Sequence, residues 1–186
     1  MSPNRRLGEG LVFLVLFALT IPAANWLIGN VGTKCLPSGP CLVPVGPGLM
    51  APSGVITIGL ALVLRDLVQR RLGVVAAVGA IVAGASISAL IAPPQLVMAS
   101  AVAFLLAELA DLAVFTPLQK RGLVLAVLAS SVVGLVVDSM LFLQLAFGNL
   151  EFLPGQVVGK AWMVLLSLPF VAWLRHRDDQ VGLSPA

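Results

Sequence analysis

Six long apolar stretches, separated by short connectors that are polar or rich in proline and glycine, run along the chain. The hydrocarbon core of a bilayer is about 30 Å thick, and a helix crosses it with about 20 apolar residues. The stretches therefore predict six transmembrane helices, at about residues 11–28, 53–72, 74–92, 95–118, 123–147 and 155–174. Because the connectors are short, we expect neighbouring helices to be antiparallel.

The stretch from Pro44 to Gly54 fits neither a helix nor a solvated loop. It is uncharged, yet proline and glycine interrupt it repeatedly. Backbone that is not hydrogen-bonded within the protein is not tolerated in lipid. We therefore expect a re-entrant segment before the second helix, lining a cavity.

The composition agrees with a membrane protein. Hydrophobic residues make up 59% of the 186 residues and charged residues 10%, against about 25% charged in an ordinary soluble domain. This excludes a water-soluble globule and leaves no room for a separate aqueous domain. The predicted fold class is all-α integral membrane, with residues 1–186 forming a single transmembrane domain.

Basic residues fall on one side when six helices are threaded through the membrane. Since cytoplasmic loops carry the excess of Lys and Arg, this side is predicted to be cytoplasmic, with both termini on it, in the plasma (inner) membrane. The first apolar run is longer than the 7–15-residue core of a signal peptide, so we interpret it as a helix. The net charge of +3 then reflects topology, and we expect the lipid bilayer as a partner but no nucleic acid. The residues on the predicted cytoplasmic side are Arg5, Arg6, Arg65, Arg70, Arg71, Lys120, Arg121, Arg175 and Arg177.

Cys35 and Cys41 lie in the first predicted outward loop, where oxidation is permitted. A disulfide and two unpaired thiols are both open interpretations. A zinc site would require more Cys or His ligands, and the single histidine, His176, follows the last helix. We expect no metal and no cofactor.

Ionisable residues inside the predicted helices carry most of the chemical information, because each costs roughly 2.5–3.5 kcal/mol at the bilayer centre. Glu108 and Asp111 are three residues apart, so they share a helical face, which Phe104 and Phe115 extend. Asp138 lies in the middle of the fifth helix.

Further polar groups lie at Gln144, at Lys160 in the sixth helix and at Asn25 in the first. These groups and the three acids could form a buried ionic network that holds helices together, or they could line a polar substrate cavity. We favour the cavity. In the second helix, Asp66 and Arg70 are expected to form an i,i+4 ion pair, with Arg65 and Arg71 as topology anchors.

The series of polar positions resembles the VUT family of queuosine precursor transporters, also described as vitamin uptake transporters. The motifs are Ala51-Pro52-Ser53-Gly54, Leu64-Arg65-Asp66, Ala107-Glu108 with Asp111 and Phe115, Ser130-Ser131, Asp138-Ser139 with Phe142, and Lys160.

The resemblance implies import of 7-cyano- or 7-aminomethyl-7-deazaguanine. A guanine-like edge presents two donors that one carboxylate can accept, and Glu108 is the first choice for this contact. Asp111 or Asp138 could meet the aminomethyl cation or further ring donors. Gln144 and Asn25 could serve the ring carbonyl and nitrogens, and Lys160 would offset acid charge. Phe104, Phe115 or Phe142 could stack on the base.

Energy coupling stays open at the sequence level. A Walker loop is not found, which leaves facilitated diffusion, proton symport or docking onto a separate ATPase. The alternatives to an autonomous transporter are the substrate-binding membrane subunit of an energy-coupling-factor vitamin transporter and a non-transporting membrane scaffold. An enzyme is not expected, since no Ser–His pairing is available within the helices. The sequence leaves open the oligomeric state, including a homo-oligomer.

Overall fold

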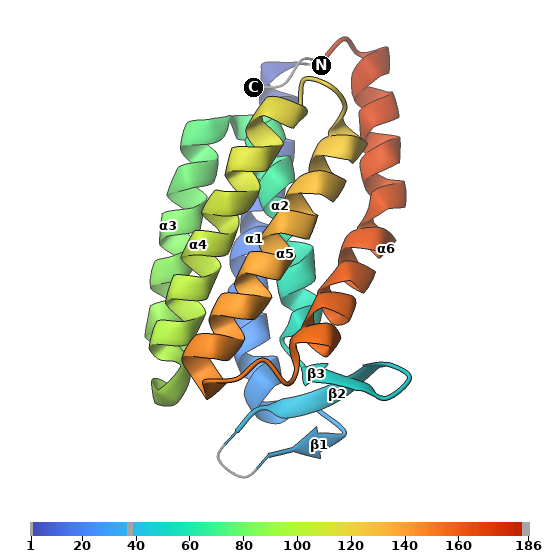
Figure 1. The fold of residues 1–186 in the computed structure, drawn as a ribbon. Helices are drawn as coiled ribbons and strands as arrows, with labels where there is room; N and C mark the ends of the chain where they lie inside the picture. Colours follow the sequence, from blue (N-terminus) through green and yellow to red (C-terminus); the bar gives the residue numbers. More distant parts are fainter. Residues whose placement is uncertain (1, 37–38, 184–186) are drawn as a thin grey trace.

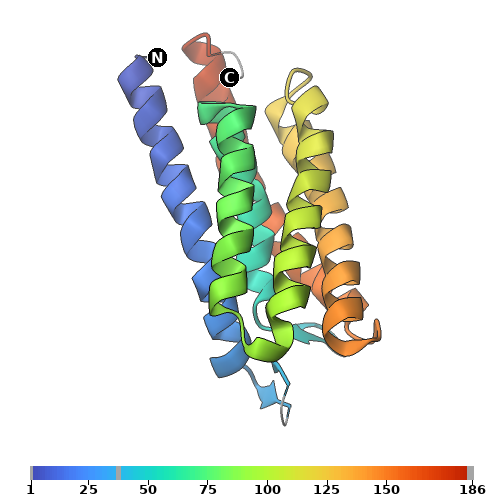
Figure 2. The ribbon, with the colours of Figure 1, turned by 90° about the vertical axis from the view of Figure 1, so that its left-hand side faces the viewer.

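The computed structural model describes residues 2–36 and 39–183 and shows a bundle of six helices with a small sheet at one end (Figure 1). The helices are α1 (Pro3–Asn30), α2 (Val55–Leu72), α3 (Val74–Ile91), α4 (Val97–Leu118), α5 (Leu123–Phe147) and α6 (Leu153–Gln180), with a 3₁₀ turn, η1 (Pro94–Leu96), before α4. The strands are β1 (Lys34–Cys35), β2 (Cys41–Gly46) and β3 (Leu49–Pro52). The start of α1 and the end of α6 lie at the opposite end of the bundle from the sheet (Figures 1 and 2). That this end is cytoplasmic stays a prediction.

Five of the helices are long and apolar enough to cross a membrane: α1, α3, α4 with its preceding turn, α5 and α6. The chain is therefore a multi-pass helical membrane protein, as predicted. The remaining helix, α2, differs because it carries four charged residues within 18. It contacts each of the other five helices, and all of residues 61–71 are buried. Helix α2 is thus the enclosed centre of the bundle, and the surrounding helices shield its charges from lipid.

The turn between α2 and α3 consists of one residue, Gly73. Its φ is 90°, a backbone conformation that residues with a Cβ rarely adopt. This turn reverses the chain directly, so α3 runs antiparallel to α2 and packs against it (Figure 2).

The stretch expected to be re-entrant has a different form. Its first residues belong to β2 and β3, which pair antiparallel with Leu42 opposite Pro52 and Val43 opposite Ala51. Pairing satisfies the backbone groups that proline and glycine would leave unbonded in a helix. The stretch forms a hairpin at the end of the bundle, so the fold is helical with one small sheet (Figure 1). Pro52 and Gly54 of this stretch line the cavity described below, as expected, and its re-entry into the membrane stays a prediction.

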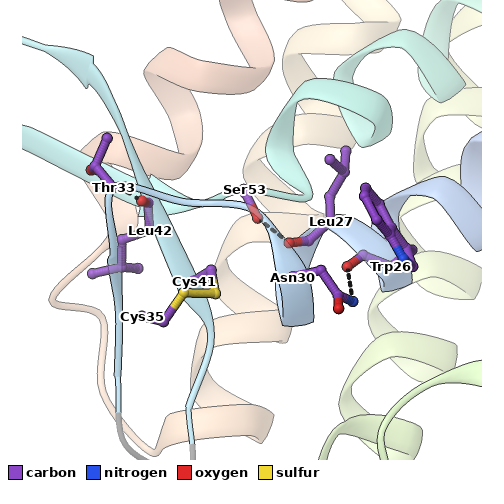
Figure 3. The surroundings of a disulfide bond; sticks show 8 residues. All are labelled: Trp26, Leu27, Asn30, Thr33, Cys35, Cys41, Leu42 and Ser53. Carbon is purple, nitrogen blue, oxygen red and sulfur yellow. Dashed lines mark hydrogen bonds between the residues drawn. A yellow bond between two sulfur atoms is a disulfide. The ribbon is translucent and has the colours of Figure 1, made fainter.

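A disulfide between Cys35 and Cys41 joins β1 to β2 (Figure 3). Of the two interpretations left open by the sequence, the structure has the bonded one. Near it, the Ser53 hydroxyl donates to the carbonyl of Leu27 at 2.7 Å, which fixes the start of α2 against the end of α1 (Figure 3). The sheet is therefore attached to the helices that form the cavity described below.

Candidate functional site

A cavity lies within the bundle, in the half nearer the sheet. Its empty volume is about 520 Å³, including the space at its mouth. All six helices contribute to its wall, from the C-terminal halves of α1, α3 and α5 and the N-terminal halves of α2, α4 and α6. The polar residues of the wall are Asn25, Ser88, Ser100, Asp138, Gln156 and Lys160, and the aromatic ones are Phe104 and Phe142.

Lys160 forms the centre of the polar wall. Its side chain is 1% exposed, and its ammonium donates to Asp138, to Gln156 and, at 2.8 Å, to the hydroxyl of Ser139. An ammonium has three donors, so these partners use all of them. Lys160 can lie this deep because α6 approaches α2 closely at Gly59, where a Cβ would come within 2.6 Å of the Lys160 carbonyl oxygen. We call Lys160, Asp138, Ser139 and Gln156 the Lys160 cluster.

Asp138 is the acid of this cluster, and it lines the cavity together with Gln156 and Lys160. The exposed fraction of the Asp138 side chain is 11%, and this side chain forms part of the cavity wall. Lys160 contacts its Oδ2, and no other side chain in the described ranges donates to the carboxylate. A carboxylate has about four acceptor sites, so Asp138 retains the capacity to bind a ligand with two donors.

A second ionic cluster lies deeper in the bundle, around Arg65 of α2. The guanidinium donates to Glu108 at 3.1 Å, to Gln69 at 3.0 Å and to Asp111. Its Nη2 also lies 2.9 Å from Asp66. The exposed fraction of each ionised side chain is 2% or less. We call Arg65, Asp66, Gln69, Glu108 and Asp111 the Arg65 cluster.

Neighbouring side chains complete the enclosure of the Arg65 cluster. The Ser130 hydroxyl of α5 donates to Asp66 at 2.9 Å, and Gln69 donates to Thr116 at 3.0 Å. The Phe115 ring centroid lies 5.7 Å from the guanidinium carbon of Arg65, within cation–π range. The cluster therefore joins α2, α4 and α5 and does not form part of the cavity wall.

Two expectations about α2 are wrong. Asp66 pairs with Arg65 and Ser130 and not with Arg70, which bonds Asp178 at 3.3 Å. Arg65 is not a cytoplasmic anchor, because it lies ten residues after the start of α2, about 15 Å along its axis. There it is fully buried, in contact with three acids.

The nine predicted site residues separate into three groups. The cavity wall contains Asn25, Phe104, Asp138, Phe142 and Lys160. The Arg65 cluster and its surroundings contain Glu108, Asp111 and Phe115. Gln144 lies on the exposed face of α5. Sequence reasoning missed Arg65 and Gln156 as functional candidates, although Gln156 precedes Lys160 by one helical turn and shares its face.

A third set of ion pairs closes the end of the bundle opposite the sheet. Arg71 donates to both carboxylate oxygens of Asp178 at 2.8 Å and to Glu9 at 3.0 Å. Arg177 also bonds Glu9. These contacts join α1, α2 and α6, so the cavity has no opening through this set of residues.

The cavity wall combines a carboxylate, amides, hydroxyls and two aromatic rings, which suits a small, planar, polar molecule. The described ranges contain no group of His, Cys, Asp or Glu residues arranged to hold a metal ion.

Comparison with known proteins gives one match and two negative results. Residues 89–174 match the family model described as "Putative vitamin uptake transporter". No curated protein and no solved structure matches the chain. The matched range contains Asp138 and Lys160 of the cavity and Glu108 and Asp111 of the Arg65 cluster, but not Arg65 itself. The description of this family and the five apolar helices indicate a membrane transporter of vitamin-like substrates. The predicted resemblance to the VUT family is thus confirmed, by a match over residues 89–174.

Proposed function

We propose that this protein imports a queuosine precursor, 7-cyano- or 7-aminomethyl-7-deazaguanine, across the inner membrane. The base binds in the cavity near the sheet, and Asp138 accepts the ring N–H and the exocyclic amino group. One observation carries the assignment: among the three acids predicted for the site, Glu108, Asp111 and Asp138, the cavity wall contains Asp138.

The chemistry of Asp138 supports recognition of a guanine-like edge. Hydrogen bonds from ring N–H and amino groups to a carboxylate are charge-assisted, and they are stronger away from water. Lys160 donates to Oδ2 and so fixes the orientation of the carboxylate. A ligand without the amino group would leave part of this acceptor unsatisfied, so such analogues are rejected.

The remaining wall supplies the other contacts. Phe104 from α4 and Phe142 from α5 are available to stack on the flat base. Asn25 and Gln156 carry amide groups that can donate to the ring carbonyl or accept from the pyrrole N–H.

The direction of transport follows from the predicted topology. With the termini in the cytoplasm, the sheet and the cavity half of the bundle face outwards. The ion pairs among Arg71, Asp178 and Glu9 then close the cytoplasmic end. The structure supports the interpretation of an outward-facing state, from which import requires the separation of these helices.

Ligand-induced thermal stabilisation of the purified protein tests the proposal. A panel of purines, deazapurines and vitamins is compared at equal concentration. A ligand at a hundredfold its dissociation constant adds about 2.7 kcal/mol to the free energy of unfolding. We expect stabilisation by the two deazaguanines and none by analogues that lack the exocyclic amino group.

Two variants and a control link the result to the cavity. Asp138→Asn, and the double variant Asp138→Asn with Lys160→Met that removes the buried pair together, should both lose the stabilisation. Asp179→Asn, in which an exposed carboxyl is changed, should keep it. Absence of any deazaguanine response in the wild type would contradict the proposal. Uptake by the purified chain alone in proteoliposomes would separate an autonomous transporter from a subunit that needs an ATPase.

A further inference from the structure

The Arg65 cluster contains more acids than its cation can balance. Asp66, Glu108 and Asp111 surround one guanidinium, so full ionisation would leave a formal charge of −2. All of these side chains are excluded from solvent. An uncompensated charge in such a place is strongly unfavourable, and a carboxylate in that position takes up a proton instead.

The other cations of α2, Arg70 and Arg71, are paired with Asp178 and Glu9 and do not relieve this excess. Helix α3 has no charged residue, and those of α1 lie in its first turns. On α6, Lys160 is occupied by Asp138. Ser130 from α5 is neutral and bonds Asp66. One bound proton would halve this excess, from −2 to −1.

An unbonded oxygen atom indicates where the proton lies. Asp111 Oδ2 is buried and has no hydrogen-bond partner in the described structure, whereas Asp66 Oδ1 lies 2.9 Å from Arg65 Nη2. Both carboxyl groups contact the same nitrogen of Arg65, Nη2. Two carboxyl groups that share one site can hold a proton between them, as a carboxylic acid beside a carboxylate.

We propose that the Arg65 cluster is a proton-binding site, in which Asp66 and Asp111 share a proton, and that its occupancy drives substrate import as proton symport. The coupling part rests on the proposed function. The cluster is connected to the cavity through α4, since Glu108 lies one turn after Phe104 of the cavity wall. The site is closed in this state, so the proton exchanges with water only when α2, α4 and α5 move.

Infrared spectroscopy of the purified protein without substrate tests the proton site directly. We expect an absorption band of a protonated carboxylic acid at neutral pH. The band should be lost in Asp66→Asn and in Asp111→Asn, and kept in Asp179→Asn. A wild-type spectrum without this band at neutral pH overturns the proton site, whatever the substrate is.

Proteoliposomes test the coupling. With the membrane potential held at zero, an inward gradient of one pH unit should concentrate a neutral deazaguanine up to about tenfold for one proton per substrate. Asp66→Asn and Asp111→Asn should equilibrate the substrate without concentrating it. Neither residue lines the cavity, so both variants should still bind ligand in the thermal assay.

The outcomes separate the two proposals. Uptake that ignores a pH gradient, or that follows a sodium gradient instead, overturns the coupling and leaves the substrate assignment intact. A protonated acid in a protein that binds no deazaguanine refutes the substrate and supports the proton site. If one of the two variants fails to fold, the other variant and the wild-type measurements still test both the proton site and its coupling to transport.

Discussion

The Arg65 cluster and the Lys160 cluster both pair a buried cation with acids, yet they differ in what they can do. Arg65 faces three acids and is sealed by α2, α4 and α5. Lys160 faces one acid, and that acid keeps contact with a cavity. The planar fork of arginine can serve several carboxylates at once, whereas the ammonium of lysine acts as a compact point charge. The role of a buried acid therefore depends on its cation partner and on whether its carboxylate reaches a cavity.

Removal of the cation from the sealed cluster should have the largest effect. Arg65→Gln leaves three acids without a positive charge, and breaking a buried pair in this way costs about 3–5 kcal/mol. We expect a large loss of folded, monodisperse protein and a much lower unfolding temperature. Fluorescence-detected size exclusion and thermal unfolding measure both. A stable Arg65→Gln protein at neutral pH would show that the cluster does not hold α2 in the bundle.

Removal of the cavity carboxylate should act mainly on transport. Asp138→Asn loses charge-assisted hydrogen bonds to the ligand, each worth about 1.5–3 kcal/mol, so uptake at low substrate concentration should fall roughly 10- to 100-fold. Initial uptake rates in proteoliposomes measure this, normalised to the amount of inserted protein. Asp179→Asn serves as the matched control. Uptake at the wild-type rate would remove Asp138 from the site.

Glu108→Gln tests whether the Arg65 cluster contains an excess of acids. It removes an acid from a cluster that has an excess of acids, and the amide can still accept from Arg65. We expect a change of about 1 kcal/mol or less in the free energy of unfolding, because only one hydrogen bond loses its charge. Denaturant or thermal unfolding measures it. A collapse of the fold comparable to that of Arg65→Gln would contradict the excess of negative charge inferred for the cluster.

Gln144→Ala should have the smallest effect. The side chain is on the exposed face of α5 and contributes to neither cluster. Surface substitutions of this kind change the free energy of unfolding by about 0.5 kcal/mol or less, and we expect uptake to be unchanged. A clear loss of uptake would mean that this face of α5 contributes to substrate passage.

The helices were predictable from the sequence and the small sheet was not. The observed bounds of α3 and α5 agree with the predicted ranges to within one residue. Their long apolar runs made this possible, because the thickness of the bilayer limits the length of a spanning helix. Residues 44–54 carry no comparable signal, since pairing between short strands depends on partners elsewhere in the chain.

The site was only partly predictable for a related reason. Helical periodicity places Glu108 and Asp111 on one face, and both do contact Arg65. Periodicity does not predict which element packs against that face. In the structure Arg65 of α2 packs there, and the two acids do not line the cavity. Arg65 was misassigned because a positive charge near a cluster of arginines was counted as a topology signal.

We predict above all that the cavity-facing acid Asp138, and not the acids paired with Arg65, contacts the ligand. Calorimetric titration of 7-cyano-7-deazaguanine into Asp138→Asn and Glu108→Gln, measured side by side with the wild type, tests this directly. We predict that Asp138→Asn raises the dissociation constant roughly 10- to 100-fold, while Glu108→Gln binds within about threefold of the wild-type dissociation constant. Loss of binding in Glu108→Gln with retained affinity in Asp138→Asn would contradict the account.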